Sequence, residues 1–184
     1  TAFLAGGIKN QDGTLTVANS VVSGNYASHY GGGIENDRGT MTLENSTVAG
    51  NSARVSGGGI MSTSSSVDPS PGILTLNNSI VTMNHADREP DLFAAEVHGS
   101  NNLIGEDPGF ARNPSAGADG YWGTEDDDPG DLHLASFAGP AVDEGDNALI
   151  PPDTADLDED LNTTEPVPFD LDRSEERRVG KECV

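Results

Sequence analysis

The sequence predicts an all-β protein, a right-handed parallel β-helix (β-solenoid) with about 26 residues in each coil and irregular acidic loops towards its C-terminal end. Three observations lead to this prediction. A glycine-rich motif that ends in isoleucine recurs at constant spacing, the apolar residues after it alternate with polar ones, and Asn and Ser recur at matching positions. A chain that stacks one short repeat on the next has these properties.

The glycine-rich motif sets the repeat length. Ile8, Ile34 and Ile60 each follow two or three glycines, and the step from one isoleucine to the next is the same both times. The third copy then runs late, because a Ser/Pro-rich insertion occupies residues 62–72, and a degenerate fourth copy covers residues 97–104. The positions that align are Leu15, Met41 and Leu74; Val17, Leu43 and Leu76; Asn19, Asn45 and Asn78; Val22, Val48 and Val81; and Asn25, Asn51 and Asn84.

Alternation with a period of two residues is typical of strands, and no 3.6-residue periodicity of a helix is sustained. Three short strands joined by tight turns make one coil, and neighbouring coils lie about 4.8 Å apart. We therefore expect the aligned aliphatic residues to form stacks inside the solenoid. We also expect Asn19, Asn45 and Asn78 to form an amide ladder at a turn, each side chain bonding to the next.

The chain divides into three predicted parts. Coils occupy residues 1–105, an acidic closing segment occupies residues 106–172, and residues 173–184, with the only cysteine, are interpreted as a non-native tail. In the closing segment, apolar residues at 132 and 134 and at 141 and 142 predict short strands that close the end of the solenoid. Because residue 1 falls in the middle of a coil, we expect the C-terminal part of a longer solenoid.

The net charge of −22 argues against nucleic acid as a partner, because the chain would repel a polyanion. Nineteen of the 31 acidic residues lie in residues 101–172, with a single basic residue among them. No basic stripe suits an anionic membrane surface and no apolar run is long enough to span a bilayer, so we expect no membrane insertion by this chain.

After the coils, four motifs follow in order: Asn-Leu-Ile-Gly at 102–105, Asp-Pro-Gly-Phe at 107–110, Asp-Leu-His-Leu at 131–134 and Gly-Pro-Ala-Val-Asp-Glu-Gly-Asp-Asn at 139–147. Together with the coils, they resemble bacterial parallel β-helix surface proteins with a choice-of-anchor region of the Q type, and the repeats of polymorphic outer-membrane proteins. The resemblance covers residues 5–172. It implies a secreted or cell-surface bacterial protein, without an established enzymatic activity.

Calcium is the cofactor that the acidic segment suggests. Ca²⁺ takes six to eight oxygen ligands from flexible loops, and a Gly-flanked run of acids can supply them. The spacing is neither that of an EF-hand nor that of a calcium β-roll, and a solvated acidic surface is the alternative. The candidate metal ligands are Asp119, Glu125, Asp126, Asp127, Asp128 and Asp131, and a second cluster comprises Asp153, Asp156, Asp158, Glu159 and Asp160. No Cys or His spacing suits zinc.

Two functional hypotheses remain open. The first is a structural or adhesive scaffold without catalysis of its own, which binds a polysaccharide or cell-surface glycan; Tyr26, Tyr30, Tyr121 and Trp122 are the aromatic rings that could stack on sugars. The alternative is a pectate-lyase-like polysaccharide lyase or hydrolase, for which Asp37, Arg38 and Arg54 are expected to project from one region of adjacent coils. Such enzymes need a convergent base or acid pair, and no recognisable spacing provides one, so no catalytic residues are assigned.

Overall fold

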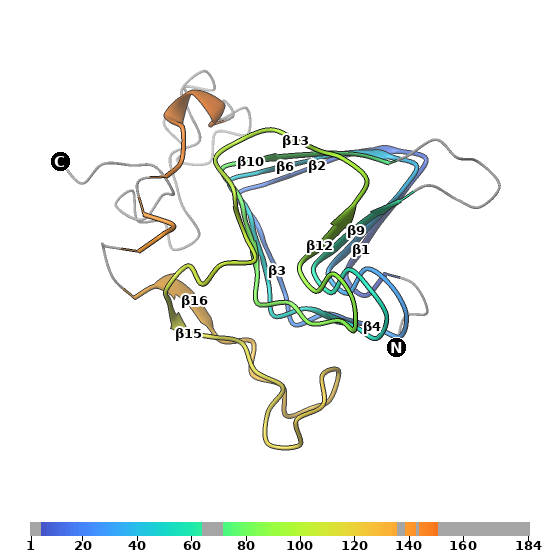
Figure 1. Cartoon of the computed structure of the whole chain (residues 1–184), viewed down its shortest axis with the longest axis vertical. Coiled ribbons are helices and arrows are strands. Elements are labelled where there is room, and N and C mark those ends of the chain that lie inside the picture. The colour runs from blue at the N-terminus through green and yellow to red at the C-terminus, as the bar shows by residue number, and fades with distance from the viewer. Residues whose placement is uncertain (1–4, 64–71, 136–138, 143, 151–184) are drawn as a thin grey trace, which may run out of the picture.

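In the computed structural model, the alternating apolar runs form strands that return to the same three parallel sheets (Figure 1). The structure describes residues 5–63, 72–135, 139–142 and 144–150. We call one passage of the chain through the three sheets a coil. The first sheet contains β1 (Ile8–Gln11), β5 (Ile34–Asp37), β9 (Ile60–Thr63) and β12 (Leu92–Ala94); the second β2 (Thr14–Ala18), β6 (Thr40–Glu44), β10 (Ile73–Asn77) and β13 (Val97–His98); the third β3 (Val21–Ser23), β7 (Thr47–Ala49), β11 (Ile80–Thr82) and β14 (Leu103–Ile104).

Smaller elements complete the described residues. The strands β4 (Tyr26–Ala27) and β8 (Ser52–Ala53) pair in parallel at one corner of the coils, and β15 (Phe110–Arg112) pairs antiparallel with β16 (Asp131–Leu134). A short 3-10 helix, η1, spans Asn147–Leu149. The predicted all-β class, with parallel strands stacked in register, is therefore confirmed.

Equivalent residues of successive coils lie beside one another. Ile8 pairs with Ile34, and Ile34 with Ile60, so the constant spacing of the isoleucines in the sequence is also the register of the first sheet. In the second sheet Met41 pairs with Leu74, because the late third copy returns to the same register. The insertion at residues 64–71 lies outside the described residues.

The predicted aliphatic stacks form the core. The inward-pointing apolar side chains of the second and third coils are completely buried: Ile34, Met41, Leu43, Val48, Ile60, Leu74, Leu76 and Val81. Burying one such side chain contributes about 1.5–3 kcal/mol before the entropy of folding is subtracted. Because aliphatic side chains form this apolar cluster, the low aromatic content is compatible with an ordered core.

The amide ladder forms at a different position from the one predicted. Asn19, Asn45 and Asn78 take φ values of +47°, +47° and +48°, so they are left-handed turn residues, a conformation that Asn tolerates better than most side chains. The ladder forms instead at Asn25, Asn51 and Asn84. The Asn25 Nδ2 donates to Asn51 Oδ1 at 2.9 Å, and the Asn51 Nδ2 donates to Asn84 Oδ1 at 3.0 Å.

Two further ladders stabilise other corners of the coils. Asn10 Nδ2 donates to Asn36 Oδ1 at 2.8 Å, and Asn36 Nδ2 donates to Ser62 Oγ at 3.1 Å. A serine ladder consists of backbone N–H groups that donate to the hydroxyl of the next coil, from Ser20 to Ser46 and from Ser46 to Ser79, at 3.2 Å each. Buried polar groups without partners destabilise a fold, so these ladders make it possible to bury Asn and Ser inside the stack.

Close approach of successive coils explains the glycine-rich motif. A Cβ built on Gly32 would collide with the backbone carbonyl oxygens of Gly58 and Ser52. A Cβ on Gly58 would meet the carbonyl of His85 in the same way. These obstacles are backbone atoms of the next coil, which cannot move aside without breaking the register.

The described part of the acidic segment packs on the flank of the coils. Phe110 and Ala141 are buried against Ala49 and Ile80, on the outer face of the third sheet. The strand predicted around Leu132 and Leu134 is confirmed as β16. The prediction of a strand at Ala141 and Val142 is wrong. These residues form a turn, in which the backbone N–H of Val142 donates to the carbonyl oxygen of Gly139.

Replacing Gly32 tests the close packing of the coils. We expect Gly32→Ala to lower the free energy of unfolding by about 3 kcal/mol or more, because the new methyl group overpacks a site bounded by backbone. Gly24→Ala is the matched control: Gly24 has a φ of +67° but open space around its Cα, so only the backbone strain of roughly 1–2 kcal/mol remains. Urea denaturation followed by circular dichroism measures both. Equal losses would contradict the close contact at Gly32.

Candidate functional site

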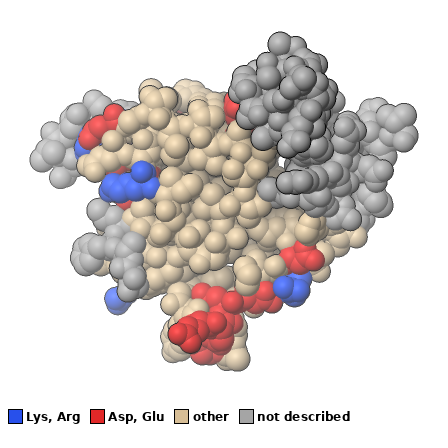
Figure 2. Space-filling model, turned by 180° about the vertical axis from the view of Figure 1, so that it is seen from behind, with Lys and Arg blue, Asp and Glu red and all other residues tan. Residues whose placement is uncertain are grey.

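The strongest candidate for a functional surface is the loop between β15 and β16, residues 113–130, which we call the acidic loop. It projects beyond the coils in Figure 1 and carries the largest group of acidic side chains in Figure 2. Arg112 and Asp128 hold its base together, with Arg112 Nε donating to Asp128 Oδ2 at 2.9 Å. The main chains of Ser115 and Asp128 also exchange two hydrogen bonds of 2.9 Å.

The acidic loop is docked on the corner that β4 and β8 form. The Trp122 ring stacks on the His85 ring, with centroids 6.2 Å apart and planes inclined by 23°. Gly123 lies against the Tyr26 ring, where a Cβ would approach the ring carbons to 2.5 Å. Tyr26 and Trp122 therefore fasten the loop to the coils, whereas Tyr121 is 74% exposed. Tyr30 lies apart, next to His29.

Internal hydrogen bonds hold the acidic loop in shape. The Asp126 carboxylate accepts from the backbone N–H groups of Ala118 and Asp119 at 2.8 and 3.1 Å, and from the Thr124 hydroxyl at 2.7 Å. Asp119 accepts from the backbone N–H of Tyr121 at 2.7 Å. These contacts fix the backbone on both sides of the exposed Tyr121 ring.

The six carboxylates predicted to bind calcium are separated by these local contacts. Asp127 accepts from the backbone N–H of Gly123, Asp128 pairs with Arg112, and Asp131 pairs with His133, while Glu125 is exposed. Within the described part of the chain, no three Asp, Glu, His or Cys side chains gather closely enough to hold a metal ion. Calcium binding stays a prediction here, and the second acidic cluster, residues 153–160, lies outside the described residues.

Hydrogen bonds lower the pKa of three carboxyl groups in or beside the acidic loop. The main cause of the lower pKa of Asp126 is the hydrogen bond from the Thr124 hydroxyl. For Asp128 it is the hydrogen bond from the Arg112 guanidinium, and for Asp131 it is the hydrogen bond from His133. In each case the partner favours the charged carboxylate over the neutral acid. The folded loop is therefore most stable while these groups are ionised.

Of the residues considered for polysaccharide cleavage, Asp37 and Arg38 form an ion pair, but Arg54 does not join them. Arg38 follows β5 and Arg54 follows β8, so they lie at two different corners of the coil. Arg38 donates to both Asp12 oxygens at 2.7 Å and to Asp37 at 3.0 Å, and its side chain is 15% exposed. A guanidinium held by two carboxylates is stabilised in its charged form, which is the wrong form for a base.

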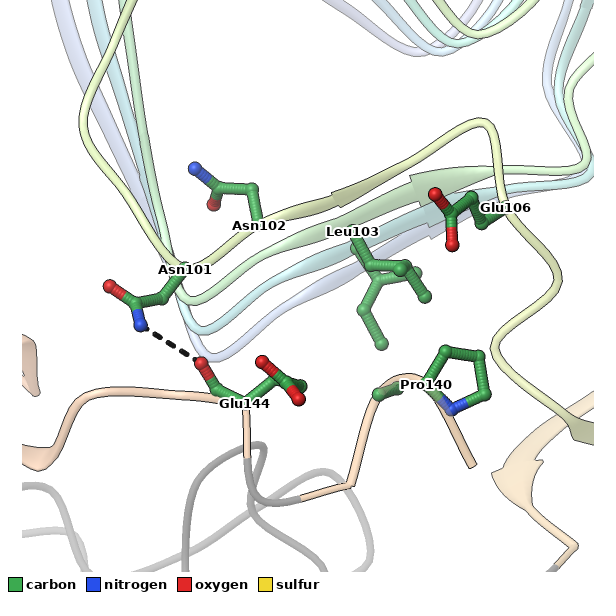
Figure 3. A pocket seen from close by; sticks show the side chains of 8 residues that line it. Asn101, Asn102, Leu103, Glu106, Pro140 and Glu144 are labelled. Carbon is green, nitrogen blue, oxygen red and sulfur yellow. Dashed lines mark hydrogen bonds between the residues drawn. The ribbon is translucent and has the colours of Figure 1, made fainter. Parts of the chain in front are cut away.

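A pocket of about 320 Å³ lies between the last coil and the segment around Pro140 (Figure 3). Ile80, Leu103 and Ala141 supply its apolar lining, and Glu106 and Glu144 contribute carboxylates. Asn101 closes one side by donating to the backbone carbonyl of Glu144 at 2.9 Å. The sequence does not predict this pocket, because its walls come from segments far apart in the chain. The contact that brings them together, between Asn101 and Glu144, occurs once and leaves no periodic pattern.

Comparison with known proteins identifies no relative: no family model, no curated protein and no solved structure matches the chain. The family resemblance of the sequence motifs therefore stays an expectation. Among the residues that the structure describes, no helix is long and apolar enough to cross a membrane.

Acidification tests the anchoring of the acidic loop. A carboxyl group whose pKa is lower in the folded loop stabilises that loop above about pH 4, and this stabilisation is lost as the pH falls through the folded pKa. Trp122 is the only tryptophan, so its fluorescence reports whether the loop stays docked on His85. We expect the emission to shift to longer wavelength below about pH 4, while the far-ultraviolet circular dichroism of the coils is retained.

Asp128→Asn, which weakens the pair with Arg112, should move this fluorescence transition towards neutral pH. Asp107→Asn is the matched control, because Asp107 accepts from the nearby backbone N–H of Gly109, outside the acidic loop. Emission that stays constant from neutral pH to well below the pKa of an ordinary carboxyl group in the unmodified chain would contradict the role of these carboxylates.

Proposed function

We propose that this chain is part of an extracellular, cell-surface β-helix of bacterial type, a structural or adhesive scaffold that has no catalysis of its own and binds glycans through its acidic loop. The parallel sheets in register, with equal steps between the paired isoleucines of the first sheet, support a right-handed β-helix whose coils have the length of the sequence repeat. The order of the sequence motifs supports the surface location.

The observation that carries the glycan proposal is the exposed Tyr121 ring on a loop fixed at both ends. An aromatic ring offers an apolar face to the C–H groups of a sugar, and its hydroxyl stays available for hydrogen bonds. The carboxylates of Asp119 and Asp126 lie in the same turn and can accept from sugar hydroxyls. Because hydrogen bonds already order this turn, less entropy is lost on binding.

The alternative of a polysaccharide lyase or hydrolase has less support. Two cations of the coils are engaged in ion pairs, Lys9 of β1 with Glu35 at 3.1 Å and Arg38, directly after β5, with Asp12 at 2.7 Å. Arg38 also pairs with Asp37 at 3.0 Å, and Arg54 lies at a different corner of the coil, so these arginines do not converge on one site. The scaffold hypothesis therefore accounts for more of the described contacts.

Binding to immobilised bacterial and plant polysaccharides tests the proposal, with and without millimolar Ca²⁺. We expect binding without depolymerisation, and a loss of roughly tenfold or more in affinity, about 1.4 kcal/mol, for Tyr121→Ala. Phe93→Ala is the matched control, because Phe93 is 40% exposed on a strand of the first sheet. Cleavage of pectate or alginate that disappears in Arg38→Ala would contradict the non-catalytic proposal.

A further inference from the structure

The pocket of Figure 3, between the last coil and the segment that packs on it, has a carboxylate on each of two sides, and we call it the two-glutamate pocket. Its volume of about 320 Å³ is at the small end of the range for small-molecule sites. Ile80 and Ala141 in its lining are buried, and Leu103 is half-buried. Glu106 and Glu144 lie on opposite sides of Leu103 (Figure 3). The pocket thus combines an apolar floor with two separated negative charges.

Hydrogen bonds from the coils fix the backbone that carries Glu144. The Asn78 Nδ2 donates to the carbonyl oxygen of Asp146, and the backbone N–H of Asp146 donates to Asn78 Oδ1, both at 2.8 Å. Asn78 is itself 1% exposed, so its amide is a rigid support. Asn101 Nδ2 donates to the carbonyl oxygen of Glu144 at 2.9 Å. Glu144 is therefore held against the last coil through its own carbonyl and through the residue two positions after it.

The backbone of Glu106 is anchored in a similar way. The hydroxyl of Thr82, a buried residue of β11, donates to the carbonyl oxygen of Glu106 at 2.6 Å. Both glutamates thus contact the coils through their backbones, and both are exposed, so a ligand can reach their side chains from solvent. Among the described residues, neither carboxylate accepts a hydrogen bond or forms an ion pair. Two fixed carboxylates with unused acceptor oxygens are available for a ligand.

The chemistry of the pocket favours an organic cation over an anion or a metal ion. Both carboxylates, in a chain of net charge −22, would repel an anion. Ca²⁺ needs six to eight oxygen ligands, and no three acidic, His or Cys side chains gather around one point in the described residues. An alkylammonium group has three N–H donors for a carboxylate, and its methylene groups can cover apolar side chains. Carboxylates on opposite sides of an apolar floor match a molecule with an ammonium group at each end.

We infer that the two-glutamate pocket binds an aliphatic diamine, with one ammonium group on Glu106, the other on Glu144, and the methylene chain across Leu103. An ion pair close to solvent contributes little alone, so both ends and the apolar chain have to act together. Because the coils already fix both glutamate backbones, binding orders little of the protein. The lining residues all lie outside the acidic loop, so this function goes beyond glycan binding and does not depend on it.

Titration calorimetry with two diamines, putrescine and hexamethylenediamine, tests the inference, because their different lengths reach different spans. Nuclear magnetic resonance of the Ile80 and Leu103 methyl groups locates the site. We expect one saturable site for at least one diamine, with methyl shifts that follow the same binding curve. We also expect that diamine to bind about fivefold more tightly than butylamine or hexylamine, which carry one ammonium group on a chain of the same length.

Glu106→Gln and Glu144→Gln should each raise the dissociation constant of the diamine about fivefold, because each removes one ion pair. Glu96→Gln is the matched control: it removes the same charge from a side chain that is 77% exposed outside the pocket, and should change the constant less than about twofold. Far-ultraviolet circular dichroism checks that each variant is folded.

Three results would overturn the inference. The first is no saturable binding of either diamine, or binding that leaves the two methyl groups unshifted. The second is equal affinity for the diamine and the monoamine of the same length. The third is equal weakening by all three variants, or displacement of the diamine by an equal concentration of Mg²⁺, because the ligand would then follow the net negative charge of the chain rather than this pocket.

Discussion

A polar side chain buried inside a stack of coils needs partners in the neighbouring coils, above all at the equivalent position, and most of this structure depends on that constraint. Asn51 shows its effect: it is completely buried, it accepts from Asn25, and it donates to Asn84 and to the backbone carbonyl of Val22. Loss of one member therefore leaves partners unsatisfied on both sides. Repetition of the same residue every coil is the simplest way to meet this condition.

The same constraint separates the scaffold from the surface that we propose to be functional. The interior of the coils contains aliphatic stacks and neutral polar ladders. The ion pairs between the first two coils include exposed side chains: Lys9–Glu35 joins β1 to β5, and Arg38–Asp12 joins the turns after these strands. Acidic side chains gather instead on the acidic loop, which is attached by Trp122, Gly123 and the Arg112–Asp128 pair. A rigid stack with a docked loop suits recognition of an extended polymer better than enclosure of a small molecule.

The sequence predicts much of the scaffold and less of the site. Identical spacing was sufficient to predict the register of Ile8, Ile34 and Ile60, because only in-register stacking keeps these side chains inside. It could not separate the asparagines that turn the backbone, such as Asn45, from those that bond between coils, such as Asn51, because both recur with the repeat. The docking of Trp122 on His85 was unpredictable for another reason: it joins an irregular loop to a coil and occurs once.

The most direct test of the ladder account is nuclear magnetic resonance of the isotope-labelled chain, with measurement of scalar couplings across hydrogen bonds. The account predicts a coupling between the backbone nitrogen of Asn25 and the side-chain carbonyl carbon of Asn51, and the same coupling between Asn51 and Asn84. It also predicts backbone couplings from Ile34 to Gly59 across adjacent coils. Couplings that connect Asn19 to Asn45 instead, or that follow another register, would contradict it.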